Sequence, residues 1–303
     1  MLKKSAPKTP KASKAEIAPI PDLLPPTNDV VFKHVFGDER NKCVTAKLLS
    51  AIMDAEIGES DITFGDPHLN REFIDDKLGI LDMFVRLKNG EKVAVEMLTG
   101  NFSNIHKRVE YYISKMMAAQ LGDGSEYPNL TPVVFILIAT ESVLKNTDKY
   151  HSEFAMMEKT ERYVLHDLRT LHIIELSKLP PNSHGRLVSW LKFILAKRKE
   201  DLVSLIKENP ELKYACDALV EVNMTAEVRA LYEVDLKRWR DEQDRTEYVV
   251  RKALNEATEK TAAEKEAALA AERRKVAEQI LDLIKQGYPV DQVEKMIRKK
   301  DAL

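Results

Sequence analysis

Cysteine and any excess of charge are what this sequence of 303 residues most clearly lacks. Its two cysteines, Cys43 and Cys216, lie far apart, which excludes a disulfide scaffold and a cysteine-based zinc site. Lys and Arg number 47 against 49 Asp and Glu, and the formal charge of −2 provides no global field for holding a nucleic acid. A polyanionic partner would need a local basic patch, and the scarcity of cysteine favours a reducing cytoplasm.

Long apolar runs and common nucleotide-binding motifs are also absent. No stretch approaches the ~20 apolar residues of a membrane-spanning helix, and the first 25 residues contain no apolar segment typical of a signal peptide. The sequence has no G-x-x-x-x-G-K-[ST], G-x-G-x-x-G or G-x-S-x-G pattern, which disfavours P-loop, Rossmann and serine hydrolase proteins. We therefore expect a soluble, cytoplasmic protein without a membrane partner.

The composition nevertheless supports a hydrophobic core, because 44% of the residues are hydrophobic and the chain is long enough for one large domain or two smaller ones. Residues 1–25, with five lysines and five prolines, are predicted to be a disordered basic tail. Residues 26–180 are predicted to form the main domain and residues 181–244 a helical region. Residues 245–303 are expected to form a long helix followed by a short terminal helix.

The periodicity of apolar residues predicts an α/β fold for the main domain. The nearly all-apolar run at 133–139 follows a helix, which indicates a central buried strand, and a hairpin combined with a crossover predicts a mixed sheet flanked by helices. Residues 150–165 fit either a strand or a loop. Helices are expected from Asn28 to Gly37, at 42–55 and at 105–121, and strands at 62–64, 80–87, 92–98, 133–139 and 172–176.

The C-terminal part is predicted to be a helical extension that contributes little to the core. Residues 245–286 are rich in Ala, Glu, Lys and Arg, which is typical of a long exposed helix or a short coiled coil. Gly287 and Pro289 are expected to end this helix, and residues 290–299 to form the short terminal one. A homo-oligomer through the long helix is the corresponding partner prediction. Its seam would consist of Leu269, Val276, Ile280 and Leu283.

The most informative stretch is the hairpin between residues 80–87 and 92–98, whose register can be argued. A three-residue loop with Gly90 in the left-handed conformation makes one face of the hairpin wholly apolar, whereas a two-residue loop would mix polar and apolar residues. On the other face the same register places Asp82 opposite Glu96, with their Cβ atoms about 5 Å apart. The predicted apolar pairs are Leu81 with Met97, Met83 with Val95, and Val85 with Val93.

Two opposed carboxylates repel each other, so this arrangement loses stability unless a cation lies between them. Mg²⁺ is usually held by one or two carboxylates together with water and substrate phosphate, which such a pair can supply. The alternative is an acidic pair on a solvated hairpin whose charge is relieved by Arg86, Lys77 or Lys92. The spacing alone leaves both interpretations open.

Several groups of residues occur in a distinctive order and spacing. They are Thr27-Asn28-Asp29-x-x-Phe32-Lys33-x-x-Phe36-Gly37-Asp38, then Asp76-Lys77-x-x-x-Leu81-Asp82, then Glu96, then Arg108-x-x-x-Tyr112-x-x-Lys115. This order resembles the PD-(D/E)XK nuclease-like family of recombination-promoting nucleases and transposases over about residues 27–140. The later Ile174-Glu175-Leu176-x-Lys178 and the helical tail resemble the family more loosely.

The resemblance implies a restriction-endonuclease-like core and Mg²⁺-dependent cleavage of DNA. Carried over by position, Asp82 and Glu96 are the metal-binding acids of the second and third core strands. The family usually has Gln or Lys two residues after the second acid, where it positions the attacking water or stabilises charge on phosphate. This sequence has Leu98 there, which can do neither, and Lys77 or Lys115 is the candidate replacement.

Other residues are candidates for contacts with metal or DNA. Asp29 resembles the family's helical acidic position near the metal, and support of the helix dipole is the alternative role. Arg108, Tyr112 and Lys115 share one helix face with Lys107 beside them, which fits either a phosphate-contacting strip or a solvated face with a half-buried tyrosine.

Three functional hypotheses follow. The first is a metal-dependent DNA endonuclease linked to recombination or transposition and weakened by Leu98. The second is a catalytically inactive DNA-binding or regulatory relative that retains the fold. The third is a helical assembly protein, for which the alanines at 262–271 make a small seam. The residue at position 98 separates the first two, because Gln or Lys there would have favoured catalysis.

Overall fold

The computed structural model describes residues 23–65, 81–100, 104–121 and 126–287, together with residues 289 and 292. The chain divides into two units at Asp235 and Leu236, and each is described here by itself. The predicted terminal helix lies outside the described residues apart from position 292.

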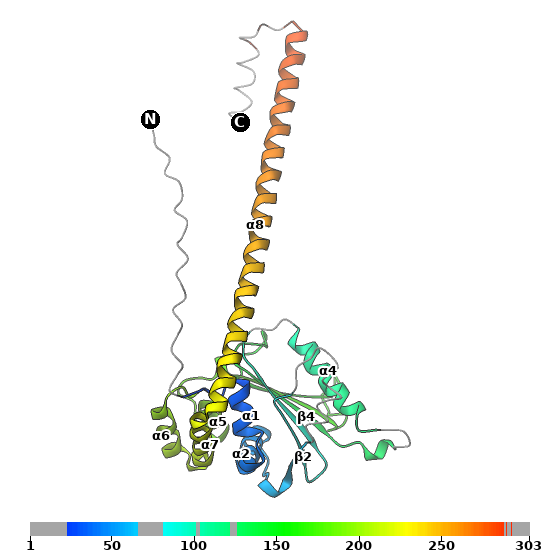
Figure 1. Ribbon diagram of the computed structural model, residues 1–303. Helices are drawn as coiled ribbons and strands as arrows, with labels where there is room; N and C mark the ends of the chain where they lie inside the picture. The colour runs from blue at the N-terminus through cyan, green and yellow to red at the C-terminus, as the bar shows by residue number, and fades with distance from the viewer. Residues whose placement is uncertain are drawn as a thin grey trace. The chain divides into compact units, whose positions relative to one another are not determined.

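A six-stranded mixed sheet forms the centre of the first unit (Figure 1). β1, β2 and β3 are antiparallel, β3, β4 and β6 are parallel, and β5 is antiparallel to β6. This mixed sheet confirms the predicted α/β class, and β5 shows that the segment left open between strand and loop begins with a strand. In spatial order the strands are β1 (Ile62–Phe64), β2 (Met83–Leu87), β3 (Lys92–Leu98), β4 (Val133–Ala139), β6 (Arg169–Glu175) and β5 (His151–Ala155).

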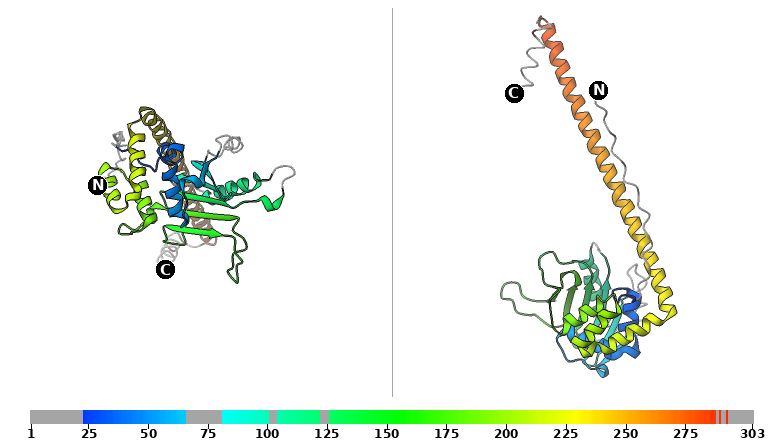
Figure 2. Two further views of the ribbon diagram at one scale, coloured as in Figure 1. Left: turned by 90° about the horizontal axis from the view of Figure 1, so that it is seen from below. Right: turned by 90° about the vertical axis from the view of Figure 1, so that its left-hand side faces the viewer.

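Helices cover both faces of this sheet. Figures 1 and 2 show α4 on one side and the group formed by α1, α2, α5, α6 and α7 on the other. The helices are α1 (Asp29–Phe36), α2 (Lys42–Met53), α4 (Ile105–Ala118), α5 (Arg186–Ile194), α6 (Lys199–Glu208), α7 (Lys213–Met224) and α8 (Ala226–Lys285). Short 3-10 turns lie at Glu39–Asn41, Glu59–Asp61, Tyr127–Asn129, Leu176–Lys178 and Pro210–Leu212.

Local sequence signals explain why α1 begins and ends where it does. The Asn28 side chain accepts hydrogen bonds from the N–H groups of Val30 and Val31, at 3.0 and 3.3 Å, which caps the helix as the sequence predicts. A Cβ at Gly37 would lie 2.7 Å from the carbonyl oxygen of Lys33, so only glycine fits at this end without a shift. These two signals fix the ends of α1. Its apolar side chains between them are buried against the body of the protein.

The seven residues of β4 are all buried, which confirms the prediction of a central strand. Alternate residues point to opposite faces. Phe135 and Leu137 belong to the apolar cluster under α4, where the ring of Tyr112 stacks on Phe135 with centroids 6.1 Å apart. Ile136 points to the other face and is equally buried. The strand therefore has a helical layer on each side, as parallel strands usually do.

Two parts of the predicted domain division differ from the structure. Leu23 and Leu24, assigned to the N-terminal tail, are fully buried, and the N–H of Leu24 donates to the Asn223 side chain at 2.6 Å. The predicted helical region also packs on the main domain, because Phe36 of α1 lies 6.3 Å from the ring of Trp190 in α5. Buried apolar contacts thus join the end of the N-terminal tail and the C-terminal helical region to the main domain, although the composition suggests separate parts.

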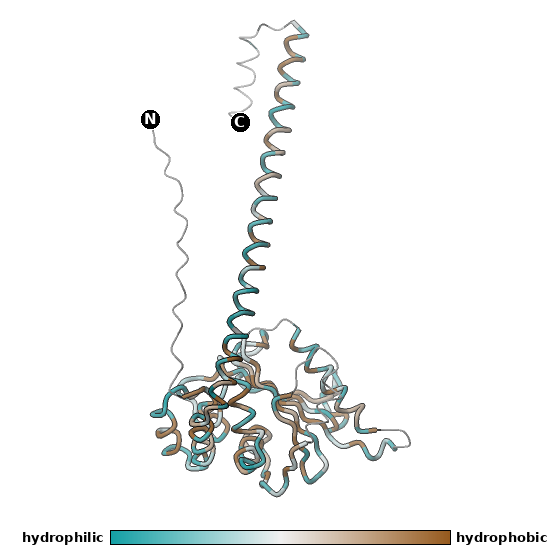
Figure 3. The backbone as a smooth tube through the Cα atoms, in the orientation of Figure 1, coloured by the Kyte–Doolittle hydropathy of each residue, from teal (hydrophilic) through white to brown (hydrophobic). Residues whose placement is uncertain are grey.

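The second unit consists of the remainder of α8 and the residues after it. All side chains from 241 to 279 are exposed, and Figure 3 colours most of this helix as hydrophilic, whereas the strands are mostly hydrophobic. α8 ends before Gly287, which has a φ of 90°, as the sequence predicts. None of the described helices combines the length and apolar character that a membrane crossing requires.

We predict that deletion of residues 245–303 leaves a folded first unit, because the last buried residue among those described is Tyr232. Circular dichroism should show a cooperative thermal transition at nearly the same temperature as for the full chain. The control is deletion from residue 213, which removes buried side chains such as Leu219 and should abolish that transition. Loss of cooperative unfolding in the first deletion would contradict the prediction.

Candidate active site at the β2–β3 hairpin

The hairpin has the register predicted from its alternating side chains. Met83 pairs with Val95 and Val85 with Val93, and all four are buried on one face. Gly90 has a φ of 89°, so the three-residue loop with a left-handed glycine is also confirmed. The period of two in a strand and the need to bury one whole face explain this agreement.

The ladder ends one residue short of the acidic pair, which corrects part of the prediction. Leu81, expected opposite Met97, instead lies in the apolar cluster under α4. Asp82 precedes β2, and its carboxylate accepts a hydrogen bond from the N–H of Met97 at 2.7 Å. Asp82 and Glu96 are therefore not paired in the β2–β3 ladder. The N–H of Met97 donates to the side chain of Asp82, and not to a backbone carbonyl of a longer β2.

Asp82 is buried beside a lysine of α1. Its Oδ1 lies 3.1 Å from Nζ of Lys33, and its side chain is only 5% exposed. Burial raises the pKa of this carboxyl above its ordinary value, and the ammonium of Lys33 and the N–H of Met97 oppose the rise. Lys33 is 38% exposed, so its charged end reaches both the buried acid and solvent.

Glu96 is buried beside an arginine of α4. Its Oε1 pairs with the guanidinium of Arg108, whereas Oε2 is buried and has no hydrogen-bond partner among the described residues. Burial raises the pKa of Glu96 to about 8; Arg108 opposes this rise, and the negative charges of Asp82 and Asp29 add to it. Oε2 of Glu96 is therefore the atom of this site that is most available to coordinate a metal ion.

Asp29 joins these two acids from the first turn of α1. Burial, followed by the charge of Asp82, raises the pKa of Asp29 to about 6, and Lys33 opposes the rise. Asp29, Asp82 and Glu96, called here the acidic cluster, thus influence one another, as the resemblance implied for the helical acid. Lys33 is the site residue that the sequence analysis missed, although its spacing of four from Asp29 on one helix was the available signal.

Two of the three cations proposed as relief for the acidic pair, Arg86 and Lys92, lie elsewhere on the hairpin. Arg86 and Lys92 face each other next to the hairpin turn, where burial and then Arg86 lower the pKa of Lys92. Lys33 pairs with Asp82, and Arg108 pairs with Glu96. Lys77, and with it Asp76 of the same motif, lies outside the described residues.

The residues of the predicted phosphate-contacting strip on α4 do not share one exposed face, because some of them are buried and others are exposed. Tyr112 is 1% exposed and belongs to the core, which corrects its assignment to a DNA contact. Arg108 turns to Glu96, whereas Lys107 is exposed. Lys115 lies two turns further along, with its Nζ 5.0 Å from the centroid of the Tyr111 ring. A helix has several faces, and the spacing alone could not tell which one packs on the sheet.

Leu98 is 4% exposed and packs with Ala94 in the apolar cluster under α4. Alternation along β3 places it on the same face as Glu96, as expected. An apolar core therefore extends up to the acidic cluster at the position where the family usually has an amide or ammonium group.

The chemistry of the acidic cluster fits a hard divalent cation. Asp82 and Glu96 provide carboxylate oxygens, and the buried Oε2 of Glu96 has no protein donor among the described residues. Within the part of the chain that the structure describes, no three acidic, histidine or cysteine side chains come together as a complete ligand set. A metal held there would depend on two carboxylates plus water and phosphate, which is the usual coordination of Mg²⁺.

A mixed α/β sheet with buried acids beside the β2–β3 hairpin is the architecture of a nuclease-like protein. The chain belongs to the PD-(D/E)XK nuclease family transposases, whose sequence profile matches residues 26–249. Membership in this family implies DNA as the partner. No curated protein and no solved structure matches the chain.

We predict that Asp29→Asn stabilises the protein at neutral pH. The folded pKa of about 6 lies above the ordinary value of 3.8, so the folded state holds an extra proton between these values and loses stability as pH rises through 6. The asparagine variant avoids this cost, and its gain in unfolding free energy should be of the order of 2 kcal/mol at pH 8 and vanish below pH 4.

Asp38→Asn is the matched control, because a hydrogen bond from the Arg40 side chain lowers the pKa of Asp38. At neutral pH this variant should be less stable than the wild type. The difference should vanish in acid, where Asp38 of the wild type is protonated. Urea unfolding at several pH values measures both effects. If Asp29→Asn leaves the stability at neutral pH unchanged, or lowers it as Asp38→Asn should, then Asp29 is not held among other acids.

Proposed function

We propose that the protein is a metal-dependent DNA endonuclease linked to recombination or transposition. The observation that carries the proposal is the pair of buried carboxylates, Asp82 and Glu96, with one oxygen of Glu96 left without a donor among the residues that the structure describes. Burying charged groups costs stability unless an opposite charge, a hydrogen-bond donor or a bound cation compensates them. Family membership supports a phosphodiester bond of DNA as the substrate class.

Asp82 and Glu96 would hold Mg²⁺ through their carboxylate oxygens. When bound, the ion would neutralise developing charge on the phosphate and lower the pKa of a water molecule. The raised pKa of Glu96 means that the site favours a proton or a cation over an uncompensated carboxylate. The two acids thus have the chemistry for binding a metal.

The cations beside the acids would act on the substrate. In the hydrolysis, a water oxygen bonds to phosphorus and one bridging P–O bond breaks, so a phosphate monoester and a hydroxyl group result. Lys33, whose side chain is partly exposed, would stabilise the negative charge on the phosphate. It would then fill the role considered for Lys77 or Lys115. Arg108, which pairs with Glu96, would orient that carboxylate.

We predict that Glu96→Ala abolishes plasmid nicking in Mg²⁺ or Mn²⁺, because a metal-binding carboxylate is lost. Lys33→Met should lower the nicking rate by about 10²-fold, which is typical for the loss of one charge-stabilising group. Glu91→Ala, which removes a carboxylate next to the hairpin turn, is the matched control and should nick as the wild type does. Equal nicking by Glu96→Ala and wild type would refute the proposed site.

A catalytically inactive DNA-binding or regulatory relative is the second candidate. Leu98 favours it, because the side chain is buried among apolar residues where water and phosphate would have to approach. The pairing of Arg108 with Glu96 favours it too, since the guanidinium already satisfies one oxygen of a metal-binding acid.

We predict that Leu98→Gln raises metal-dependent nicking if the protein is a weakened nuclease, since an amide there can position the attacking water. The gain should approach the 10²-fold to 10³-fold that such a group commonly contributes. Burying the amide costs roughly 1–3 kcal/mol, so folding is checked by circular dichroism, with Leu98→Met as an apolar control. A folded Gln variant without any gain would favour the inactive relative.

Self-association through the end of α8 is a compatible additional property. Leu269, Val276, Ile280 and Leu283 recur at seam spacing, and the first two are 50% and 36% exposed. A second copy of the same helix would cover this seam. Sedimentation should then give a mass of two or more chains for the full-length protein and a mass of one chain for the deletion of residues 245–303.

A further inference from the structure

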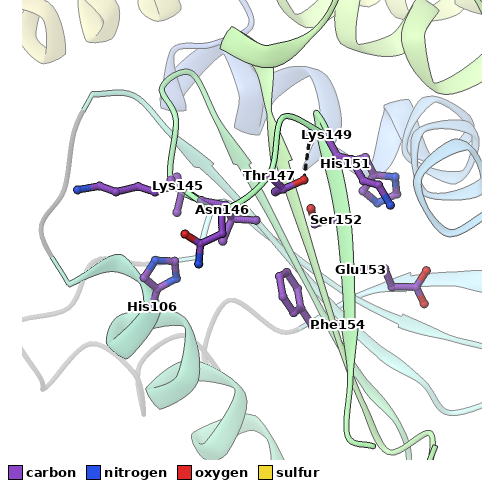
Figure 4. Close-up of a pocket in the computed structure, with 11 residues that line it drawn as sticks. His106, Lys145, Asn146, Thr147, Lys149, His151, Ser152, Glu153 and Phe154 are labelled. Carbon is purple, nitrogen blue, oxygen red and sulfur yellow. Dashed lines mark hydrogen bonds between the residues drawn. The ribbon is translucent and has the colours of Figure 1, made fainter. Parts of the chain in front are cut away.

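A cavity of about 890 Å³ lies beside the N-terminal end of α4, away from the acidic cluster (Figure 4). Its wall consists of His106, the loop at 143–149 and the edge strand β5. Lys145 and Lys149 bring positive charge, and Asn146, Thr147 and Ser152 bring neutral hydrogen-bonding groups. Figure 4 draws Glu153 pointing away from Phe154 and His106. The same figure draws Lys145 extending outward from the loop and Lys149 on the side of β5 that carries His151 and Glu153, so the two lysines do not face one place in the cavity. The cavity therefore offers neutral hydrogen-bonding groups rather than concentrated positive charge.

A smaller cavity of about 240 Å³ shares three lining residues with the first, namely His106, Leu144 and Phe154. Its remaining wall is mostly apolar and includes Leu137 and Ile173 of the cluster under α4. Phe154 lies between the two cavities and is 44% exposed. An exposed aromatic ring between a polar and an apolar space provides a surface on which a flat ring can stack.

The loop that forms this wall is held in place by a buried ion pair. Glu175 at the end of β6 is fully buried, and one of its oxygens accepts hydrogen bonds from the N–H groups of Val143 and Leu144 at 2.6 and 2.9 Å. Lys178 pairs with the other oxygen at 2.8 Å and donates to the carbonyl oxygen of Thr147 at 2.7 Å. The loop is thus preorganised, which lowers the entropy cost of binding.

The register of the sheet relates these cavities to the acidic cluster. Glu96, Leu137 and Ile173 are in register across β3, β4 and β6, and they point to the same face. Adjacent strands are about 4.8 Å apart, so the backbone at Ile173 is about 10 Å from that at Glu96. One DNA strand could reach both places at once.

We propose that the two cavities bind one unpaired nucleotide of the substrate DNA, with the base stacked on Phe154. Cavities of about 890 and 240 Å³ have room for a single nucleotide. A base inside a duplex is already paired and stacked, so it cannot also stack on Phe154. This inference rests on DNA as the partner under the proposed function. It adds a preference for DNA that has a single-stranded tail, a flap or a gap near the cleavage position.

The test is fluorescence anisotropy with the full chain in EDTA, so that binding is measured without cleavage. The probes are a blunt duplex and the same duplex with a single-stranded tail. Wild type should bind the tailed DNA more tightly. Phe154→Ala should weaken tailed binding by about 5- to 150-fold, which corresponds to the loss of stacking on one base, and leave blunt binding unchanged.

Two exposed neighbours outside the cavity provide matched controls. Met156→Ala removes an apolar side chain that is 43% exposed, and Lys159→Gln removes an exposed lysine. Both should bind tailed DNA as the wild type does. The proposal is overturned if Phe154→Ala binds both probes as the wild type does, or if Met156→Ala has the same effect. Displacement by free dTMP without any preference for the tail would assign the cavities to a free nucleotide and also overturn it.

The outcome is independent of nicking. A preference for tailed DNA that requires Phe154 supports the inference even if no variant nicks DNA, in which case only the endonuclease proposal fails. Nicking that requires Glu96, combined with equal binding of tailed and blunt DNA by wild type, would refute the inference and leave the endonuclease proposal intact.

Discussion

Compensation of buried negative charge is the constraint on which the arrangement around the sheet depends. Asp82 and Glu96 are removed from water at the end of the hairpin, and a buried charge without a partner is strongly destabilising. Lys33 comes from α1 and Arg108 from α4, so the two helices are each tied to the hairpin by one cation. Asp29 adds a third acid, and burial is the largest cause that raises the pKa values of all three carboxyls, against the opposing charges of Lys33 and Arg108. A cluster of this kind gains most from a further cation or from protons.

Two buried glutamates near the carboxyl ends of parallel strands illustrate different uses of the same group. Glu175 at the end of β6 is satisfied by backbone N–H groups and by Lys178, and hydrogen bonding with this lysine lowers its pKa against the effect of burial. Glu96 near the end of β3 keeps one oxygen without a partner among the described residues, and its pKa is raised. A satisfied carboxylate holds a loop in one conformation, whereas an unsatisfied one is available to a ligand. Ligands of open α/β sheets commonly bind at this edge of the strands.

Leu98 sets the limits of the proposed chemistry. The apolar cluster under α4 continues through this side chain up to the neighbourhood of Glu96, so the ordinary amide or ammonium of the family has been replaced by part of the core. Lys33 approaches the acids from α1 and provides a positive charge from another direction. Whether one ammonium on a different helix replaces the missing group is the chemical question that separates the two functional candidates.

The sequence by itself determined the local features of the molecule. The cap at Asn28, the buried central strand and the hairpin register follow from rules that act over a few residues, namely capping, the period of two and the chemistry of glycine turns. The partners of the acids, the burial of Tyr112 and the attachment of Leu24 to Asn223 were decided only by the tertiary structure. Ion pairs and core contacts depend on distances between elements that are remote along the chain, and a pattern within one element does not contain those distances.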